Sequence, residues 1–198
     1  MFARMGTWKT VATVAAAAAL AAAPVRAQTW NGTLSGSQQV PANASPATGF
    51  TSITLSGNQL QVSLTWSGIT GGPIMAGHIH CCTVGDAAGQ NVGVAVPFVG
   101  LEPGTSGEYS HTFDLLDAGV YTNSFLTTLG GGTALGARDV LINALNGGRA
   151  YVNIHNATYP GGEIRSNVAL VTPEPTTFAL AAAGVAGAGL VARRRRTA

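Results

Sequence analysis

The middle of the chain alternates apolar and polar residues with the period of a β-strand. In the run from Thr51 to Trp66, apolar side chains recur at every second position on both sides of Gly57-Asn58, which predicts a β-hairpin with one buried face. Glycine- or proline-containing turns separate most of the other alternating runs. The same period predicts strands over residues 30–36, 74–80, 92–98, 108–115, 150–155 and 163–171.

One segment departs from this period. From Thr133 to Leu145 the apolar residues recur at helical spacing, and Asn146-Gly147-Gly148 supplies a C-terminal stop. A weaker helical turn is expected over residues 121–129. We therefore predict an all-β fold, an antiparallel β-sandwich of about seven or eight strands with a short helical insertion before the last two.

The N-terminal end has the pattern of an export signal. Arg4 and Lys9 precede an uncharged, alanine-rich run over residues 11–23, and Pro24 and a small-x-small site ending at Ala27 follow it. This order is typical of a secretory signal peptide, and the run is shorter than the roughly 20 apolar residues that span a bilayer. We predict a signal peptide over residues 1–27, cleaved after Ala27.

The C-terminal end consists of three parts in a fixed order. Pro173-Glu174-Pro175 comes first, then an uncharged stretch over residues 176–192, and then Arg193, Arg194, Arg195 and Arg196. The stretch is marginally long enough for a membrane-spanning helix, which the arginines would hold in place as a single-pass anchor. The order of the parts resembles the PEP-CTERM sorting signal. That resemblance implies recognition and removal of the tail by an exosortase at the surface of a bacterium that makes exopolysaccharide.

The two ends also account for the apparent basic charge of the protein. The whole chain has a formal net charge of +2, but the segment from residue 28 to residue 172 keeps three arginines, seven carboxylates and no lysine, a net charge of −4. A basic patch for phosphate groups is absent from it, which excludes nucleic acid as a partner. The segment is long enough for one domain with a core. We expect a signal peptide over 1–27, a β-sandwich domain over 28–172 and a sorting signal over 173–198.

Five short phrases carry a family resemblance. They are Ser37-Gln38-Gln39-Val40-Pro41, Ala47-Thr48-Gly49, His78-Ile79-His80, Tyr151-Val152-Asn153-Ile154-His155 and Pro160-Gly161-Gly162-Glu163-Ile164-Arg165. Together they resemble the CHRD (chordin-type) domain over nearly the whole segment, although Ser166-Asn167 replaces the glycine and polar residue usual in the family. The resemblance implies an extracellular module, and no reaction is established for the bacterial members.

The histidines offer candidate chemistry within this domain. His78 and His80 lie two residues apart on a predicted strand and therefore point to the same face, and His155 lies on another strand. If these faces converge, His78, His80, His155 and Glu163 form a mononuclear site suited to copper or zinc. In the alternative, the same side chains and Arg165 form a buried hydrogen-bonding network and bind no metal.

Cys81 and Cys82 follow His80 directly, a pair that resembles the bacterial, PEP-CTERM-sorted branch of the family. An exported protein meets oxidising conditions, but adjacent Cα atoms are about 3.8 Å apart across a trans peptide, whereas disulfides usually need roughly 4.4–6.8 Å. We favour a vicinal disulfide with a distorted peptide. Thiolate ligation of a metal beside His80 and bridges to another molecule stay open.

The sequence contains no nucleophile elbow, no phosphate-binding loop and no close carboxylate pair with an activating base, so we name no catalytic residue. It favours a non-enzymatic surface or matrix module, a binding or structural component of the cell envelope or extracellular matrix. The expected partners are signal peptidase, an exosortase-type enzyme, and exopolysaccharide or other surface proteins. The alternative is a mononuclear copper- or zinc-binding protein, open to redox chemistry, that uses His78, His80 and His155.

Overall fold

One antiparallel sheet runs through the computed structural model, which describes residues 27–171. Its strands follow the order β5-β4-β7-β8-β1-β2-β3-β6, and β9 pairs with β1 beside β8. Every pairing is antiparallel. The strands are β1 (Gln28–Ser35), β2 (Thr48–Ser56), β3 (Gln59–Ser67), β4 (Ala76–Cys81), β5 (Val94–Pro97), β6 (Gly107–Asp114), β7 (Ala150–His155), β8 (Ile164–Asn167) and β9 (Ala169–Leu170).

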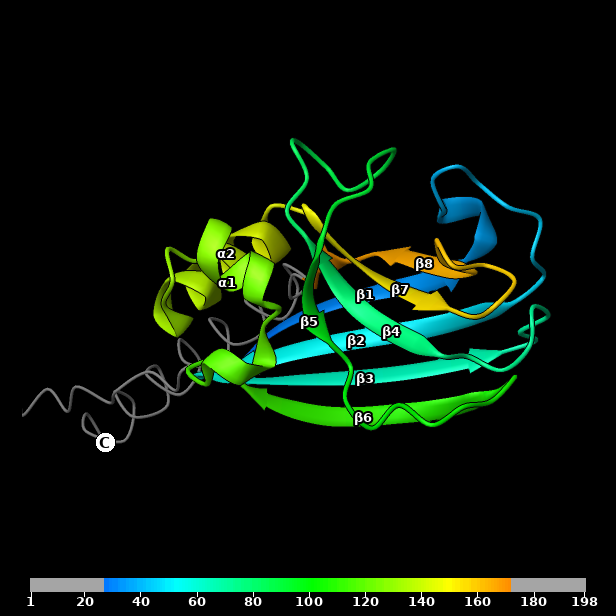
Figure 1. The fold of residues 1–198 in the computed structure, drawn as a ribbon, viewed down its shortest axis with the longest axis horizontal. Coiled ribbons are helices and arrows are strands. Elements are labelled where there is room, and N and C mark those ends of the chain that lie inside the picture. The colour runs from blue at the N-terminus through cyan, green and yellow to red at the C-terminus, as the bar shows by residue number, and fades with distance from the viewer. Residues whose placement is uncertain (1–26, 172–198) are drawn as a thin grey trace, which may run out of the picture.

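The sheet curls until its two ends meet (Figure 1). Phe98, directly after β5, stacks on Tyr109 of β6 with ring centroids 5.3 Å apart. At the middle of the strand order, β1 and β8 share a single register pair, Ser35 with Arg165, so the two halves of the sheet are joined along a short seam. The halves face each other across one core, as the layers of a sandwich do. The predicted all-β antiparallel fold is confirmed, with the difference that both layers belong to one continuous sheet.

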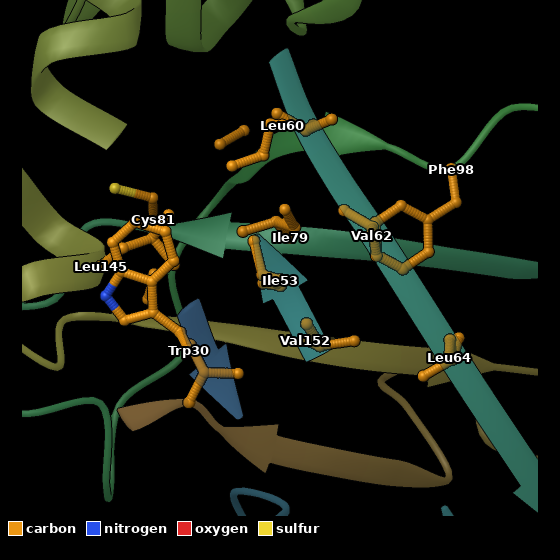
Figure 2. Packing of buried hydrophobic residues seen from close by; sticks show 14 of the residues in the cluster. Trp30, Ile53, Leu60, Val62, Leu64, Ile79, Cys81, Phe98, Leu145 and Val152 are labelled. Atoms are coloured by element: carbon orange, nitrogen blue, oxygen red, sulfur yellow. The ribbon is translucent and has the colours of Figure 1, made fainter. Parts of the chain in front are cut away.

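The core lies between these two halves and is built by the alternation seen in the sequence. Trp30, Ile53 and Val62 point inward from one half, and Ile79 and Val152 point inward from the other, all with no solvent exposure (Figure 2). Burial of each such side chain contributes about 1.5–3 kcal/mol relative to leaving it in water. Because Ile79 and Val152 are fixed inward, their neighbours on β4 and β7 must face outward.

The helical insertion lies between β6 and β7, as the spacing predicted. It consists of α1 (Asn123–Thr128) and α2 (Ala134–Asn146), and short 3-10 turns lie at Gly36–Gln38 and Ala118–Val120. The Thr133 hydroxyl caps α2 by accepting from the backbone N–H of Gly136. Both helices lie at one end of the curled sheet (Figure 1), where α2 closes the core with its buried face. That face consists of Ala137, Leu141, Ala144 and Leu145.

The two ends of the domain lie next to each other. β9 pairs with β1 through Trp30 and Leu170, and the backbone N–H of Val171 donates to the carbonyl of Thr29 at 2.7 Å. The residues predicted to form the signal peptide, apart from Ala27, and the sorting signal lie outside the described part of the chain. No helix within residues 27–171 combines the length and the apolar character needed to cross a membrane.

Candidate metal centre

Three histidines form one cluster on the outer face of the β4–β7 pair. Ile79 pairs with Val152 and both face the core, so His78 and His80 point to the opposite side of β4. His155 lies on the same outer side of β7. One ring nitrogen from each of the three histidines lies within 4.8 Å of those of the other two. The structure thus brings together three of the four residues predicted to bind a metal.

Backbone carbonyls orient two of the rings. Nδ1 of His80 lies 2.8 Å from the carbonyl oxygen of Val92, and Nδ1 of His155 lies 2.9 Å from that of Pro160. Since a carbonyl only accepts, each Nδ1 carries the proton and each Nε2 keeps a free lone pair. Metal-binding histidines are typically held in this way, with the second ring nitrogen donating to a carbonyl or carboxylate.

Three of the four ring nitrogens that remain are buried and have no hydrogen-bond partner among the described residues. They are Nδ1 of His78 and Nε2 of His80 and His155. A buried polar atom left without a partner costs about 1–3 kcal/mol and is rare in native proteins. A metal ion about 2.0–2.1 Å from each nitrogen would satisfy all three and set them roughly 3.3–3.6 Å apart. The cluster therefore needs only a small closing movement of the rings to hold an ion.

Burial keeps these imidazoles in the form that binds metal. It lowers the pKa of His78 to about 4, with a further contribution from the nearby His155 and His80. Burial also lowers the pKa of His80 to about 4, against the hydrogen bond to Val92, and lowers the pKa of His155. Because a histidine must be neutral to bind a metal, the cluster is ready to do so at neutral pH.

Glu163 does not join the histidines. Its buried carboxylate accepts from the Ser45 hydroxyl at 2.6 Å, from the backbone N–H of Thr70 at 2.8 Å and from the Asn156 side chain. Burial acts to raise the pKa of Glu163, and hydrogen bonds such as those from Ser45 and Thr70 outweigh it and lower the pKa. The extended strand begins only at Ile164, after the turn at Gly162, so the alternation expected to aim Glu163 at the histidines does not yet apply. The candidate ligand set is corrected to three histidines.

Arg165 also has partners other than the predicted ones. Its fully buried guanidinium lies over the ring of Tyr151, 3.4 Å from the centroid, and donates to Asn167 Oδ1, to Asn91 Oδ1 and to the carbonyl of Ala87. The network considered as the alternative to a metal site differs from this arrangement, because Glu163 bonds neither to Arg165 nor to a histidine. Arg165 and Glu163 each have a separate hydrogen-bonding network that contains none of the three histidines.

Tyr151 links the network of Arg165 to the cluster. Its ring is stacked on His80, with centroids 4.6 Å apart and planes 4° apart, and the backbone N–H of Val92 donates to its hydroxyl at 3.1 Å. Sequence reasoning did not identify Tyr151 as part of the site. The available signal was the polar outward face of β7, where Tyr151, Asn153 and His155 alternate with Val152 and Ile154.

Two loops cover the outer face around the histidines. The loop over residues 82–93 contributes Val92 and Asn91, and Asn91 donates to the carbonyl of Val40 at 2.6 Å. The loop after β1 contributes Gln39, which donates to Asn153 Oδ1 at 2.6 Å. This cover leaves His80 only 8% exposed, whereas His78 and His155 are half-buried. The cluster is consequently open to solvent on the side of these two histidines.

Cys81 and Cys82 form a disulfide at the end of β4. Cys81 points into the core (Figure 2). Because successive side chains of a strand point to opposite faces, His80 lies on the other side of β4. The group of side chains able to hold a metal within residues 27–171 contains no cysteine. The pair is thus structurally separate from the histidine cluster, although it adjoins His80 in the sequence.

Comparison with known proteins gives two family matches. The model of the CHRD domain matches residues 30–168, and that of the PEP-CTERM protein-sorting motif matches residues 171–196. No curated protein and no solved structure matches the chain.

Proposed function

The chain belongs to the CHRD domain family, and we propose that its domain holds one transition-metal ion through His78, His80 and His155. The PEP-CTERM motif makes it an exported protein that an exosortase-type enzyme sorts to the cell surface. The observation that carries the proposal is the cluster of three histidines, which have ring nitrogens within 4.8 Å of one another and each contain one buried ring nitrogen without a hydrogen-bond partner among the described residues.

The chemistry of the donors points to copper or zinc. Imidazole suits both metals, and three neutral protein ligands leave at least one coordination position for water or another ligand. That position would face the open side of the cluster, between the half-buried His78 and His155. The proposed protein is therefore a mononuclear metal-binding protein of the cell surface with an exchangeable ligand position.

The test is the metal content of the protein prepared without an affinity tag. We expect close to one equivalent of copper or zinc by elemental analysis after reconstitution, and loss of that metal in His78→Ala and His155→Ala. His111→Ala is the matched control, because the fourth histidine lies on β6 and outside the cluster. Less than about a tenth of an equivalent in the folded wild-type protein would overturn the proposal.

A second candidate function, a matrix-binding module, is favoured by the outer face of β2, β3 and β6. A groove of about 500 Å³ lies there, and two rows of side chains cross the three strands in register. One row is Ser52, Ser63 and Ser110, and the other is Phe50, Thr65 and Glu108. An exposed aromatic ring beside rows of hydroxyl groups, on a domain without lysine, suits a neutral sugar chain such as an exopolysaccharide.

A further inference from the structure

We propose that the three-histidine cluster is a copper centre that favours the cuprous over the cupric state, and that Arg165 sets this preference. The inference rests on the proposed metal-binding function and adds to it the identity of the metal and its redox state. It rests on two observations: the three ligands are neutral, and the positive charge of Arg165 lies over Tyr151, which is stacked on the ligand His80.

The cluster supplies no negative charge to a bound ion. Its three donors are imidazoles, and no carboxylate or thiolate belongs to the group within the described residues. The carboxylate that the sequence suggested as a ligand, Glu163, accepts hydrogen bonds from Ser45, Thr70 and Asn156 instead. An ion in the site therefore keeps its full charge, whether it carries one positive charge or two.

Arg165 adds a buried positive charge on the same face of the sheet. Its side chain has no solvent exposure, and its three hydrogen-bond acceptors are the amide oxygens of Asn91 and Asn167 and the carbonyl of Ala87. The only ion pair found within residues 27–171 joins Arg138 and Asp139. No carboxylate in this part of the chain neutralises Arg165, and its burial limits screening by salt.

The strand order places this charge close to the histidine cluster. β7 lies between β4 and β8, so Tyr151 stands between His80 and Arg165. Tyr151 is stacked on His80 with nearly parallel planes, and the guanidinium lies over the Tyr151 ring. The ring of Tyr151 thus lies between Arg165 and the proposed ligand His80 and is in contact with both.

A fixed positive charge destabilises a dication about twice as much as a monocation at the same place, because the Coulomb energy scales with the product of the charges. Arg165 therefore disfavours Cu(II) and Zn(II) relative to Cu(I). Reduction of the site is the addition of one electron from an external one-electron reductant to Cu(II), giving Cu(I), with the three neutral nitrogens kept as ligands. The buried arginine makes this step more favourable.

The experiment measures the reduction potential of the copper-loaded protein by spectroelectrochemical titration with one-electron mediators. Arg165→Gln should lower the preference for Cu(I) over Cu(II) by about tenfold, which for a one-electron couple is about 59 mV. Arg165→Lys, which keeps the charge, should stay close to the wild type. The control Arg149→Gln removes an arginine that directly precedes β7 and is not stacked on Tyr151, and it should leave the potential unchanged.

An unchanged potential in folded Arg165→Gln would overturn the inference. If that variant does not fold, the test compares the affinities of the wild-type protein for the two copper ions. Competition with bicinchoninate measures its affinity for Cu(I), and competition with nitrilotriacetate measures its affinity for Cu(II). Tighter binding of Cu(I) is expected, and tighter binding of Cu(II) would contradict the inference while leaving the metal site intact. If the folded protein binds neither Cu(I), Cu(II) nor Zn(II), the proposed metal-binding function itself is wrong.

Discussion

The guanidinium of Arg165 lies over the ring of Tyr151, 3.4 Å from its centroid, on the outer face of a β-sheet and out of contact with solvent. Burial of an arginine without a carboxylate partner lowers the stability of the fold unless its N–H groups find other hydrogen-bond acceptors. Here two asparagine side chains and a backbone carbonyl accept hydrogen bonds from the guanidinium, and the ring of Tyr151 packs against its face. Tyr151 is thereby in contact with the guanidinium on one side and stacked on the ring of His80 on the other.

Tyr151 can be tested through two substitutions that separate its ring from its hydroxyl. Tyr151→Phe keeps the stack on His80 and loses the hydrogen bond from Val92, so we expect a loss of about 0.5–1.5 kcal/mol in the free energy of unfolding and unchanged metal affinity. Tyr151→Leu removes the stack and should also weaken metal binding. Urea unfolding and metal titration measure the two effects. Equal metal affinity in both variants would show that the stack does not support His80.

The lowered pKa values of the histidines give the metal-free domain a defined pH dependence. An unfolded histidine titrates near 6.5, whereas His78 and His80 titrate at about 4 in the folded domain. Between these values the unfolded state binds more protons, so stability falls as the pH drops from about 6.5 to about 4. Above about pH 6.5 the titration of these two histidines should no longer change the free energy of unfolding. Urea unfolding of the metal-free protein at several pH values measures this, and greater stability at pH 5 than at pH 7 would contradict it.

Glu163→Gln distinguishes a structural carboxylate from a metal ligand. The substitution places an amide N–H₂ among donors from Ser45, Thr70, Gly71 and Asn156, so we expect a loss of about 2–4 kcal/mol in stability. The protein that remains folded should still bind one metal ion. Glu108→Gln, at an exposed position, is the control for the loss of charge. Loss of metal from a folded Glu163→Gln variant would restore Glu163 to the ligand set.

The disulfide between Cys81 and Cys82 should be independent of metal binding. We expect no free thiol in the exported protein by mass spectrometry under non-reducing conditions. The double variant Cys81→Ala/Cys82→Ala should keep one equivalent of metal, because the cluster contains no sulfur ligand. Metal loss in the folded double variant, or two alkylated thiols in the wild type, would go against this expectation.

Local periodicity predicted much of the fold. The predicted strand over residues 150–155 coincides with β7, and the helix expected over residues 133–145 is α2, shifted by one residue at each end. The period of two also placed His78 and His80 on one face. These features depend on neighbouring residues in the chain, which is why the sequence alone indicates them.

Other features depend on contacts between distant segments and could not be predicted in this way. Arg165 is buried because the loop over residues 82–93 folds back over β7 and β8, and no local pattern indicates that path. The partners of Glu163, Ser45 and Thr70, lie about a hundred residues earlier in the chain. The closure of one sheet into two layers likewise requires the meeting of Phe98 and Tyr109 at its two ends.

The matrix-binding function predicts a role for Phe50. Phe50→Ala should reduce retention of the domain on immobilised exopolysaccharide from the producing cells, because Phe50 is an exposed aromatic side chain in the groove over β2, β3 and β6. Leu129→Ala is a matched control, since both side chains are 46% exposed. Equal retention of the two variants and the wild type would speak against this groove as a sugar site.

The pairing of β1 with β9 has a mechanical consequence. The domain begins and ends at the same place, with Thr29 bonded to Val171, and the sorting motif starts at residue 171. A force applied to the chain at residue 171 would therefore act first on the short β1–β9 ladder, because Val171 directly follows β9. The histidines on β4 and β7 lie farther along the strand order, on the other side of β8. Attachment through residue 171 would therefore hold the domain where β1 and β9 pair, with β8 between this attachment and the strands that carry the histidines.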